Sequence, residues 1–189
     1  MGVLWPATIV LAIMVIGTRQ LGLFILMHDA AHGALHSNRK INDWVGKWFC
    51  GADLHPYRGY HLQHHRFVQQ TEDPDLVLSA PFPVTPDSLR RKIMRDLTGQ
   101  TFFKQRFGRL TEQLQARPPG EAAWPLIAAE ARQQRAFLIG NGLGLALFSA
   151  AGLWWAWVLM WLLPMATWLP LVSRLRNISE HALIAQNST

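Results

Sequence analysis

The chain has 189 residues, half of them apolar and nine of them tryptophan, and its formal net charge is +6. This length suits one domain, and the composition is typical of a membrane protein with tryptophan at the membrane–water interface. Lysine and arginine are dense between residues 39 and 135 and nearly absent from residues 1–38 and 136–173. Such segregation indicates membrane topology, and because no basic groove interleaved with aromatic residues is evident, we exclude nucleic acid as a partner. The single cysteine, Cys50, excludes an internal disulfide and a thiolate metal cage.

Residues 3–27 form the first predicted element, a membrane-spanning helix. The run is apolar except for Arg19 and a few small polar residues, and at a rise of about 1.5 Å per residue it is long enough to cross a bilayer. It lacks the basic start of a cleavable signal peptide. Arg19 either meets a substrate carbonyl or a buried acid, or its side chain extends to the membrane interface, and we favour the interface.

The segment from about residue 39 to residue 135 is predicted to face water. Within it, residues 88–115 are predicted to form a basic, partly amphipathic helix that lies either against anionic lipid headgroups or with its charged face in solvent. Because lysine and arginine resist export in short loops, this segment is expected on the cytoplasmic side, with a bacterial inner membrane as the expected location.

Residues 136–173 contain no charged residue. The stretch is too long for one ordinary span, so it predicts two short spans, 136–152 and 154–173, joined by a turn near Gly152. One long span with a re-entrant piece is the alternative. The predicted fold class is therefore an all-α integral membrane protein, a single partial domain with about three spans, the first over 3–27, and with a cytoplasmic histidine-rich cap.

Five histidines fall into two tight clusters, and these residues point to chemistry. The first cluster is His28 and His32, and the second is His61, His64 and His65. Residues three and four apart share one face of a helix, so each cluster directs its imidazoles one way. Five neutral imidazoles beside a strongly apolar chain indicate a metal site.

Two further histidines fall outside these clusters. His36 is four residues after the first cluster and is interpreted as a neighbour of the site or a surface residue. His55 precedes Pro56 and is predicted to lie in a loop.

The two clusters resemble the histidine boxes of the membrane fatty acid desaturase family, which have the forms HxxxH and HxxHH. A lone HxxxH motif is weak evidence for the family. Two boxes about thirty residues apart, with the first at the end of a predicted span, are strong evidence. Two nearby segments also resemble the family: Asn42-Asp43-Trp44-Val45-Gly46 and Glu72-Asp73-Pro74-Asp75. The resemblance implies that His181 is a further metal ligand and that Asn177 holds a water on the metal.

This resemblance implies the metal ligands, the reaction and the partners of the site. The implied ligands are His28, His32, His61, His64, His65 and His181, with Asn177 acting through a water. The family uses two iron ions, with dioxygen as co-substrate, to desaturate a fatty acyl lipid or an acyl thioester. Imidazole suits iron and resists oxidation better than a thiolate does. The electron donor is expected to be of the ferredoxin or cytochrome b5 type, because the chain shows no flavin or nicotinamide motif.

Carboxylates near the boxes are expected to orient the imidazoles. The candidates are Asp29, Glu72, Asp73, Asp75 and Glu180. Alternatively, the aspartates of the second segment form ion pairs with Arg58 or Arg66.

The chain departs from the family pattern in two respects: one predicted span precedes the first box where the family usually has two, and the third box is missing. No third HxxHH box follows His181, so we expect a chain truncated before that box, with incomplete iron binding on its own. A carotenoid ketolase or hydroxylase with similar boxes is an alternative enzyme. A non-catalytic membrane protein that binds zinc or another metal through the two boxes is the alternative from another class.

Overall fold

The computed structural model describes residues 5–50, 54–68, 70–75 and 84–181, with the backbone alone at residues 180 and 181. Every element in this part of the chain is helical, which confirms the predicted all-α class. The elements are α1 (Trp5–His32), α2 (Arg39–Trp44), the π-helix η1 (Val45–Phe49), α3 (Leu54–Arg66), α5 (Pro86–Leu97), α6 (Gln100–Ala116), α7 (Trp124–Gln133), α8 (Arg135–Ala150), α9 (Trp154–Trp157), the π-helix η2 (Val158–Leu162), α10 (Leu163–Ala166) and α11 (Trp168–His181).

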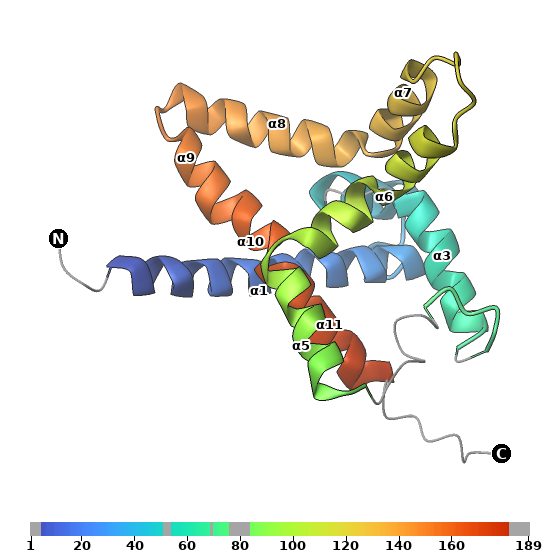
Figure 1. Cartoon of the computed structure of the whole chain (residues 1–189), viewed down its shortest axis with the longest axis horizontal. Helices are drawn as coiled ribbons and strands as arrows, with labels where there is room; N and C mark the ends of the chain where they lie inside the picture. Colours follow the sequence, from blue (N-terminus) through green and yellow to red (C-terminus); the bar gives the residue numbers. More distant parts are fainter. Residues whose placement is uncertain (1–4, 51–53, 69, 76–83, 182–189) are drawn as a thin grey trace.

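Helix α1 extends along the longest dimension of the molecule (Figure 1). Its 28 residues make a rod about 42 Å long. Only 11% of its most apolar window is buried inside the protein, so most of its apolar surface faces outward. The helix ends in a Schellman motif at Gly33, whose φ is 77°: the Gly33 amide donates to the Ala30 carbonyl and the Ala34 amide to the Asp29 carbonyl.

The second long apolar run comprises α9, η2, α10 and α11. Residues Trp154–Ser179 are long and apolar enough to cross a membrane, as α1 is. The predicted turn before this run is present at Gly152, whose φ is 72°, and it joins α8 to α9 as a helical hairpin (Figure 1). Helix α8 has 16 residues, about 24 Å against a hydrocarbon thickness of about 30 Å. The predicted span 136–152 therefore stays a prediction.

The basic middle segment contains two helices where one was predicted over 88–115. Helices α5 and α6 meet at Gly99, whose φ of 78° is a left-handed conformation that ends α5 and redirects the chain. The fully buried Asp96 lies just before this break and accepts hydrogen bonds from Arg174 (2.5 and 2.8 Å) and Thr101 (2.5 Å). These contacts fix α5 and α6 against α11.

The main cluster of buried apolar residues lies where the C-terminal end of α1 meets α3. It consists of Met27, Ala30, Ala31 and Leu54. The alanines are small, so they allow the neighbouring helices to approach α1 closely. Gly46 of η1 contributes to the same close approach, because a Cβ at this position would lie 2.5 Å from the Ala30 Cβ. Within the described part of the chain, this buried apolar cluster is therefore next to the first histidine cluster.

Candidate metal centre

The first histidine cluster lies on the last two turns of α1. His28 and His32 are four residues apart, so their rings lie on one face, with ring centroids 4.8 Å apart. His28 is half-buried, whereas His32 is exposed at the last helical position. The helix stops there because Gly33 adopts the left-handed conformation.

The second cluster lies on α3. His61 is buried and His65, one turn further along, is exposed. Tyr57, one turn before His61, stacks on its ring at 5.3 Å with an interplanar angle of 8°. His55 belongs to the first turn of this helix and not to a loop, because Pro56 is compatible with a helix N-terminus, where its missing N–H is not needed.

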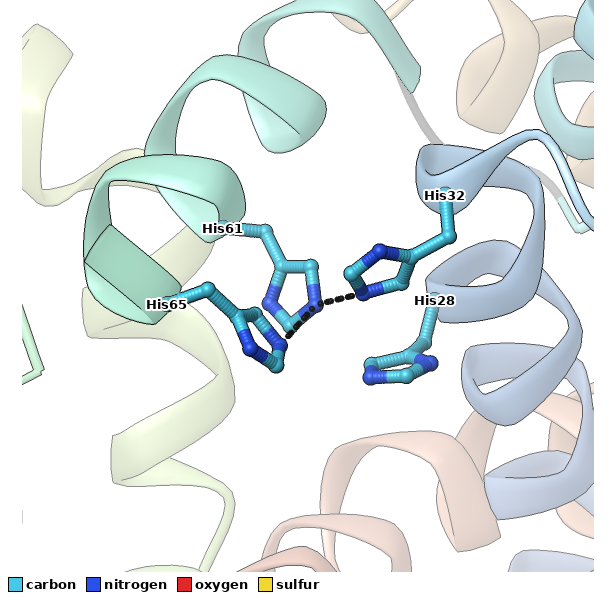
Figure 2. Close-up of side chains that lie close together, drawn as sticks. All are labelled: His28, His32, His61 and His65. Atoms are coloured by element: carbon cyan, nitrogen blue, oxygen red, sulfur yellow. Dashed lines mark hydrogen bonds between the residues drawn. The ribbon is translucent and has the colours of Figure 1, made fainter. Parts of the chain in front are cut away.

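Four imidazoles from the two helices converge. His28, His32, His61 and His65 point toward one another across the space between α1 and α3 (Figure 2), and their ligand atoms lie within 4.8 Å of each other. The Nε2 atoms of His32 and His65 each lie 3.0 Å from Nε2 of His61. Around an octahedral ion with bonds of about 2.1 Å, adjacent ligand atoms are about 3.0 Å apart and opposite ones about 4.2 Å apart. Two of the separations equal the adjacent spacing, and the limit of 4.8 Å is somewhat wider than the opposite spacing, so the four nitrogens lie near enough to bind a single transition-metal ion.

The electrostatics of the cluster suit metal binding. Burial, reinforced by the neighbouring imidazoles of His28, His65, His32 and His64, lowers the pKa of His61 from 6.5 to about 3. The ring is therefore neutral at physiological pH. A neutral imidazole is the form that binds a metal, so protons compete weakly for this position.

His64 is placed differently from the four converging histidines. It is buried, and its Nδ1 contacts the carboxylate of Asp73 at 2.8 Å and that of Asp75 at 3.7 Å. The Asp75 amide donates to the Asp73 carboxylate at 2.8 Å, and Tyr60 donates its hydroxyl proton to Asp75. This carboxylate contact fixes the ring and leaves Nε2 as the nitrogen that would bind a metal, the usual arrangement for a ligand histidine.

Asp29 makes a similar contact on α1. Its carboxylate lies 3.1 Å from Nδ1 of His28. Asp29, Asp73 and Asp75 thus all lie beside histidines, and their role in orienting metal-bound imidazoles stays a prediction. Glu72 is exposed, and its carboxylate accepts a hydrogen bond from Thr71.

Arg58 connects the two histidine-bearing helices. Its guanidinium donates to the carbonyls of Ala30 and Ala31 at the end of α1, both at 2.9 Å, and pairs with Asp43 at 2.5 Å. Donation by Arg58 lowers the pKa of Asp43 to about 2. The alternative pairing of Arg58 with the aspartates after α3 is therefore not the one observed. The buried Asn42 completes the arrangement by donating to Ala30 at 2.9 Å.

These supporting contacts were missed in the sequence, although their signals were present. The carbonyls in the last turn of a helix need partners from outside the helix, and Gly33 marks where α1 ends. Asn42 and Asp43 stood in a segment that resembles the family, and the structure shows their physical role.

The remaining predicted residues either lie apart from the four-histidine cluster or have side chains outside the part of the chain that the structure describes. His36 is exposed, and its Nδ1 accepts a hydrogen bond from the Asn38 amide. Asn177 lies on α11 and lines a cavity with Tyr60 and Asp75. Glu180 and His181 end α11, and their side chains are outside the described part of the chain.

Two cavities lie beside α1. The larger, about 620 Å³, reaches Tyr57 and Tyr60 next to the second histidine cluster, and its walls come from α1, α3, α6, α8 and α11. The smaller, about 530 Å³, is lined by the exposed Arg19 and by apolar residues of α1 and η2. Gln20 and Trp157 belong to the walls of both cavities. The space beside the histidines is thus large and mainly apolar.

Comparison with known proteins assigns the class. The profile of the family described as fatty acid desaturase matches residues 4–188, so the chain belongs to the fatty acid desaturase family. It resembles an omega-3 fatty acid desaturase, chloroplastic, of Glycine max, with 37% identity over 62 residues, which are 30% of this chain and 14% of that protein.

Two further relatives carry more specific names. An sn-2 acyl-lipid omega-3 desaturase (ferredoxin), chloroplastic, of Helianthus annuus is 38% identical over 28% of this chain and 12% of its own length. An sn-1 acyl-lipid omega-3 desaturase (ferredoxin) of Synechocystis sp. is 30% identical over 31% of this chain and 16% of its own length. The chain thus matches less than a fifth of the length of each of these relatives. No solved structure matches the chain.

Proposed function

We propose that this chain forms the iron-binding part of a membrane desaturase that inserts a double bond into a fatty acyl chain. The observation that carries the proposal is the convergence of four imidazoles from α1 and α3, with ligand atoms within 4.8 Å of one another. Membership of the desaturase family and the mainly apolar cavity beside the histidines support it.

The proposed ligands divide into two groups. His28, His32, His61 and His65 would hold one iron ion, because their nitrogens have the spacing of ligands on one ion. His64, oriented by Asp73, would contribute to a second ion, together with His181 and a water held by Asn177. Asp29, Asp75 and Glu180 would orient imidazoles or their partners.

The bound iron would supply the activation of dioxygen that allows hydrogen removal from an unactivated C–H bond. The overall reaction takes two hydrogens from adjacent acyl carbons. It consumes one dioxygen, two electrons and two protons, and it yields one double bond and two waters. The apolar cavity would align the acyl chain beside the histidines and exclude bulk water.

The electrons would come from a separate protein. A ferredoxin is the favoured donor, because two relatives carry that word in their names, and a cytochrome b5-type protein is the other candidate. The acyl group would be carried by a lipid or by a thioester.

The chain is proposed to be an integral protein of a bacterial inner membrane, with α1 and Trp154–Ser179 as spans. Only 11% of the most apolar window of each helix is buried, so each has a large apolar surface that lipid would cover. The concentration of lysine and arginine between residues 39 and 135 supports the proposal that the histidines lie on the cytoplasmic side.

The test combines metal and product analysis. The full reading frame that contains this chain would be expressed in a host without the activity, and iron, zinc, lipids and pigments would be measured. About two irons per protein and a new acyl double bond are expected, both lost in His61→Ala and both kept in His55→Ala. One zinc per protein without iron, or a double bond that survives His61→Ala, would contradict the proposal.

A further inference from the structure

Arg106 is a cation that faces the larger cavity from α6. Its guanidinium carbon lies 3.9 Å from the centroid of the Phe137 ring and 5.8 Å from that of Phe102. Burial lowers the pKa of Arg106, but an arginine stays charged at any physiological pH. The aromatic faces attract the cation without neutralising it.

Glu130 attracts Arg106 electrostatically, but its carboxylate is hydrogen-bonded to other residues. Glu130 accepts hydrogen bonds from Arg109 at 2.6 Å and from Gln134 at 2.5 Å. The guanidinium of Arg106 donates to the Gln134 amide oxygen at 3.5 Å. Among the residues that the structure describes, no carboxylate lies within 4.0 Å of Arg106. A partly buried cation of this kind has most of its hydrogen-bonding capacity available to a ligand.

The position of Arg106 relates it to the histidines. Arg106, Phe102 and Phe137 line the same cavity of about 620 Å³ as Tyr57 and Tyr60, which lie beside the second histidine cluster. The cavity combines a mainly apolar wall with the cations Arg106, Arg174 and Arg176, of which Arg174 is paired with Asp96, so it suits an apolar chain that carries an anionic group. In an acyl lipid or acyl thioester the acyl carboxyl group is esterified and neutral, so a negative charge on the substrate belongs to its carrier, and phosphate is the anion that phospholipids and phosphopantetheine thioesters share.

We propose that Arg106 binds the phosphate of the carrier that delivers the acyl chain to the histidines. The inference rests on the proposed function, because it assumes that the cavity holds an acyl substrate. The guanidinium fork matches two phosphate oxygens and forms charge-assisted hydrogen bonds. The phosphate belongs either to a phospholipid or to a phosphopantetheine thioester, and the two sources can be separated by experiment.

The experiment uses three probes with the same photoactivatable acyl chain: a phosphatidylglycerol, a phosphopantetheine thioester and a neutral diacylglycerol. The metal-free chain in detergent is cross-linked with each probe, and modified peptides from α6 and α8 are quantified. The unmodified chain should label more strongly with one phosphate-bearing probe than with the diacylglycerol, and that probe identifies the source. Equal labelling of the unmodified chain by all three probes would by itself overturn the proposal.

Variants then test whether Arg106 causes the preference for the phosphate-bearing probe. Arg106→Gln should lower labelling by the preferred probe about tenfold or more, because it removes charge-assisted hydrogen bonds, and Arg106→Lys should lower it less. The control is Lys104→Gln, which removes one positive charge from an exposed position of the same helix. If Arg106→Gln and Lys104→Gln behave alike, the proposal is wrong. The assay uses metal-free protein, so a failure here leaves the iron and product measurements to judge the proposed function separately.

Discussion

Gly46→Ala tests whether close packing behind the histidines determines the metal site. A Cβ at Gly46 would lie 2.5 Å from the Ala30 Cβ and 2.9 Å from a methyl group of Leu54. The Leu54 methyl can turn away, but the Ala30 Cβ is fixed to the backbone of α1, so η1 must move away from that helix. Overpacking of this kind costs about 1–3 kcal/mol, which is a fall in melting temperature of roughly 2–12 °C for a protein of this size.

Iron affinity should fall in the same variant, because Ala30 lies between His28 and His32 on α1 and Leu54 begins the helix that carries His61. The assay is thermal unfolding in detergent together with iron titration. Gly59→Ala is the matched control: it lies on α3, and its Cβ would meet nothing within 4 Å, so greater helix propensity should leave stability equal or higher by up to about 1 kcal/mol. If the two variants show the same stability and iron affinity, the packing argument is refuted.

Two further predictions concern the histidines themselves. Asp73→Asn should lower the iron affinity measured by titration about 10–100-fold, because the carboxylate that orients His64 is lost. Glu72→Gln should leave the iron affinity unchanged. Equal losses of iron affinity in the two variants would contradict the role of Asp73. The metal-free protein should lose stability as the pH falls from 6.5 toward 3, because the pKa of folded His61 is about 3 and the unfolded chain binds the extra proton in that range. Melting curves from pH 7 to 4.5 should show a smaller loss of stability in His61→Asn than in the unmodified protein, and the same loss in His55→Asn as in the unmodified protein. If His61→Asn loses as much stability as the unmodified protein, His61 is not the group responsible.

Local spacing predicted how the histidines of each cluster are arranged on their own helix. The four-residue intervals within the two clusters place each histidine pair on one face of a helix, and helix periodicity is a property of the backbone alone. That α1 and α3 bring His28 and His32 against His61 and His65 is a tertiary fact. It could be expected from the resemblance to the family, but not from periodicity.

The choice of partners could not be predicted from the sequence. Arg58 could pair with several acids, and only the packed structure shows that Asp43 and the end of α1 are its partners. The break between α5 and α6 had a signal in Gly99, but a glycine within a helical pattern is often tolerated. The predicted segment 136–152 nearly coincides with α8 (Arg135–Ala150), but an uncharged stretch does not show whether so short a helix crosses a membrane.

The contacts of Arg58 explain how the two clusters can hold their spacing. Arg58 precedes His61 by three residues on α3, so both lie on the face that meets α1. Its hydrogen bond to the Ala31 carbonyl satisfies a group that the end of α1 leaves without an intrahelical partner, and its hydrogen bond to the Ala30 carbonyl adds to those from the Gly33 amide and Asn42. Together these bonds fix α3 at one distance from α1. His32 follows Ala31 directly, so this distance also sets the 3.0 Å spacing between the His32 and His61 nitrogens. The ligand geometry therefore follows from backbone capping, and a metal ion would meet imidazoles that the protein has already brought together.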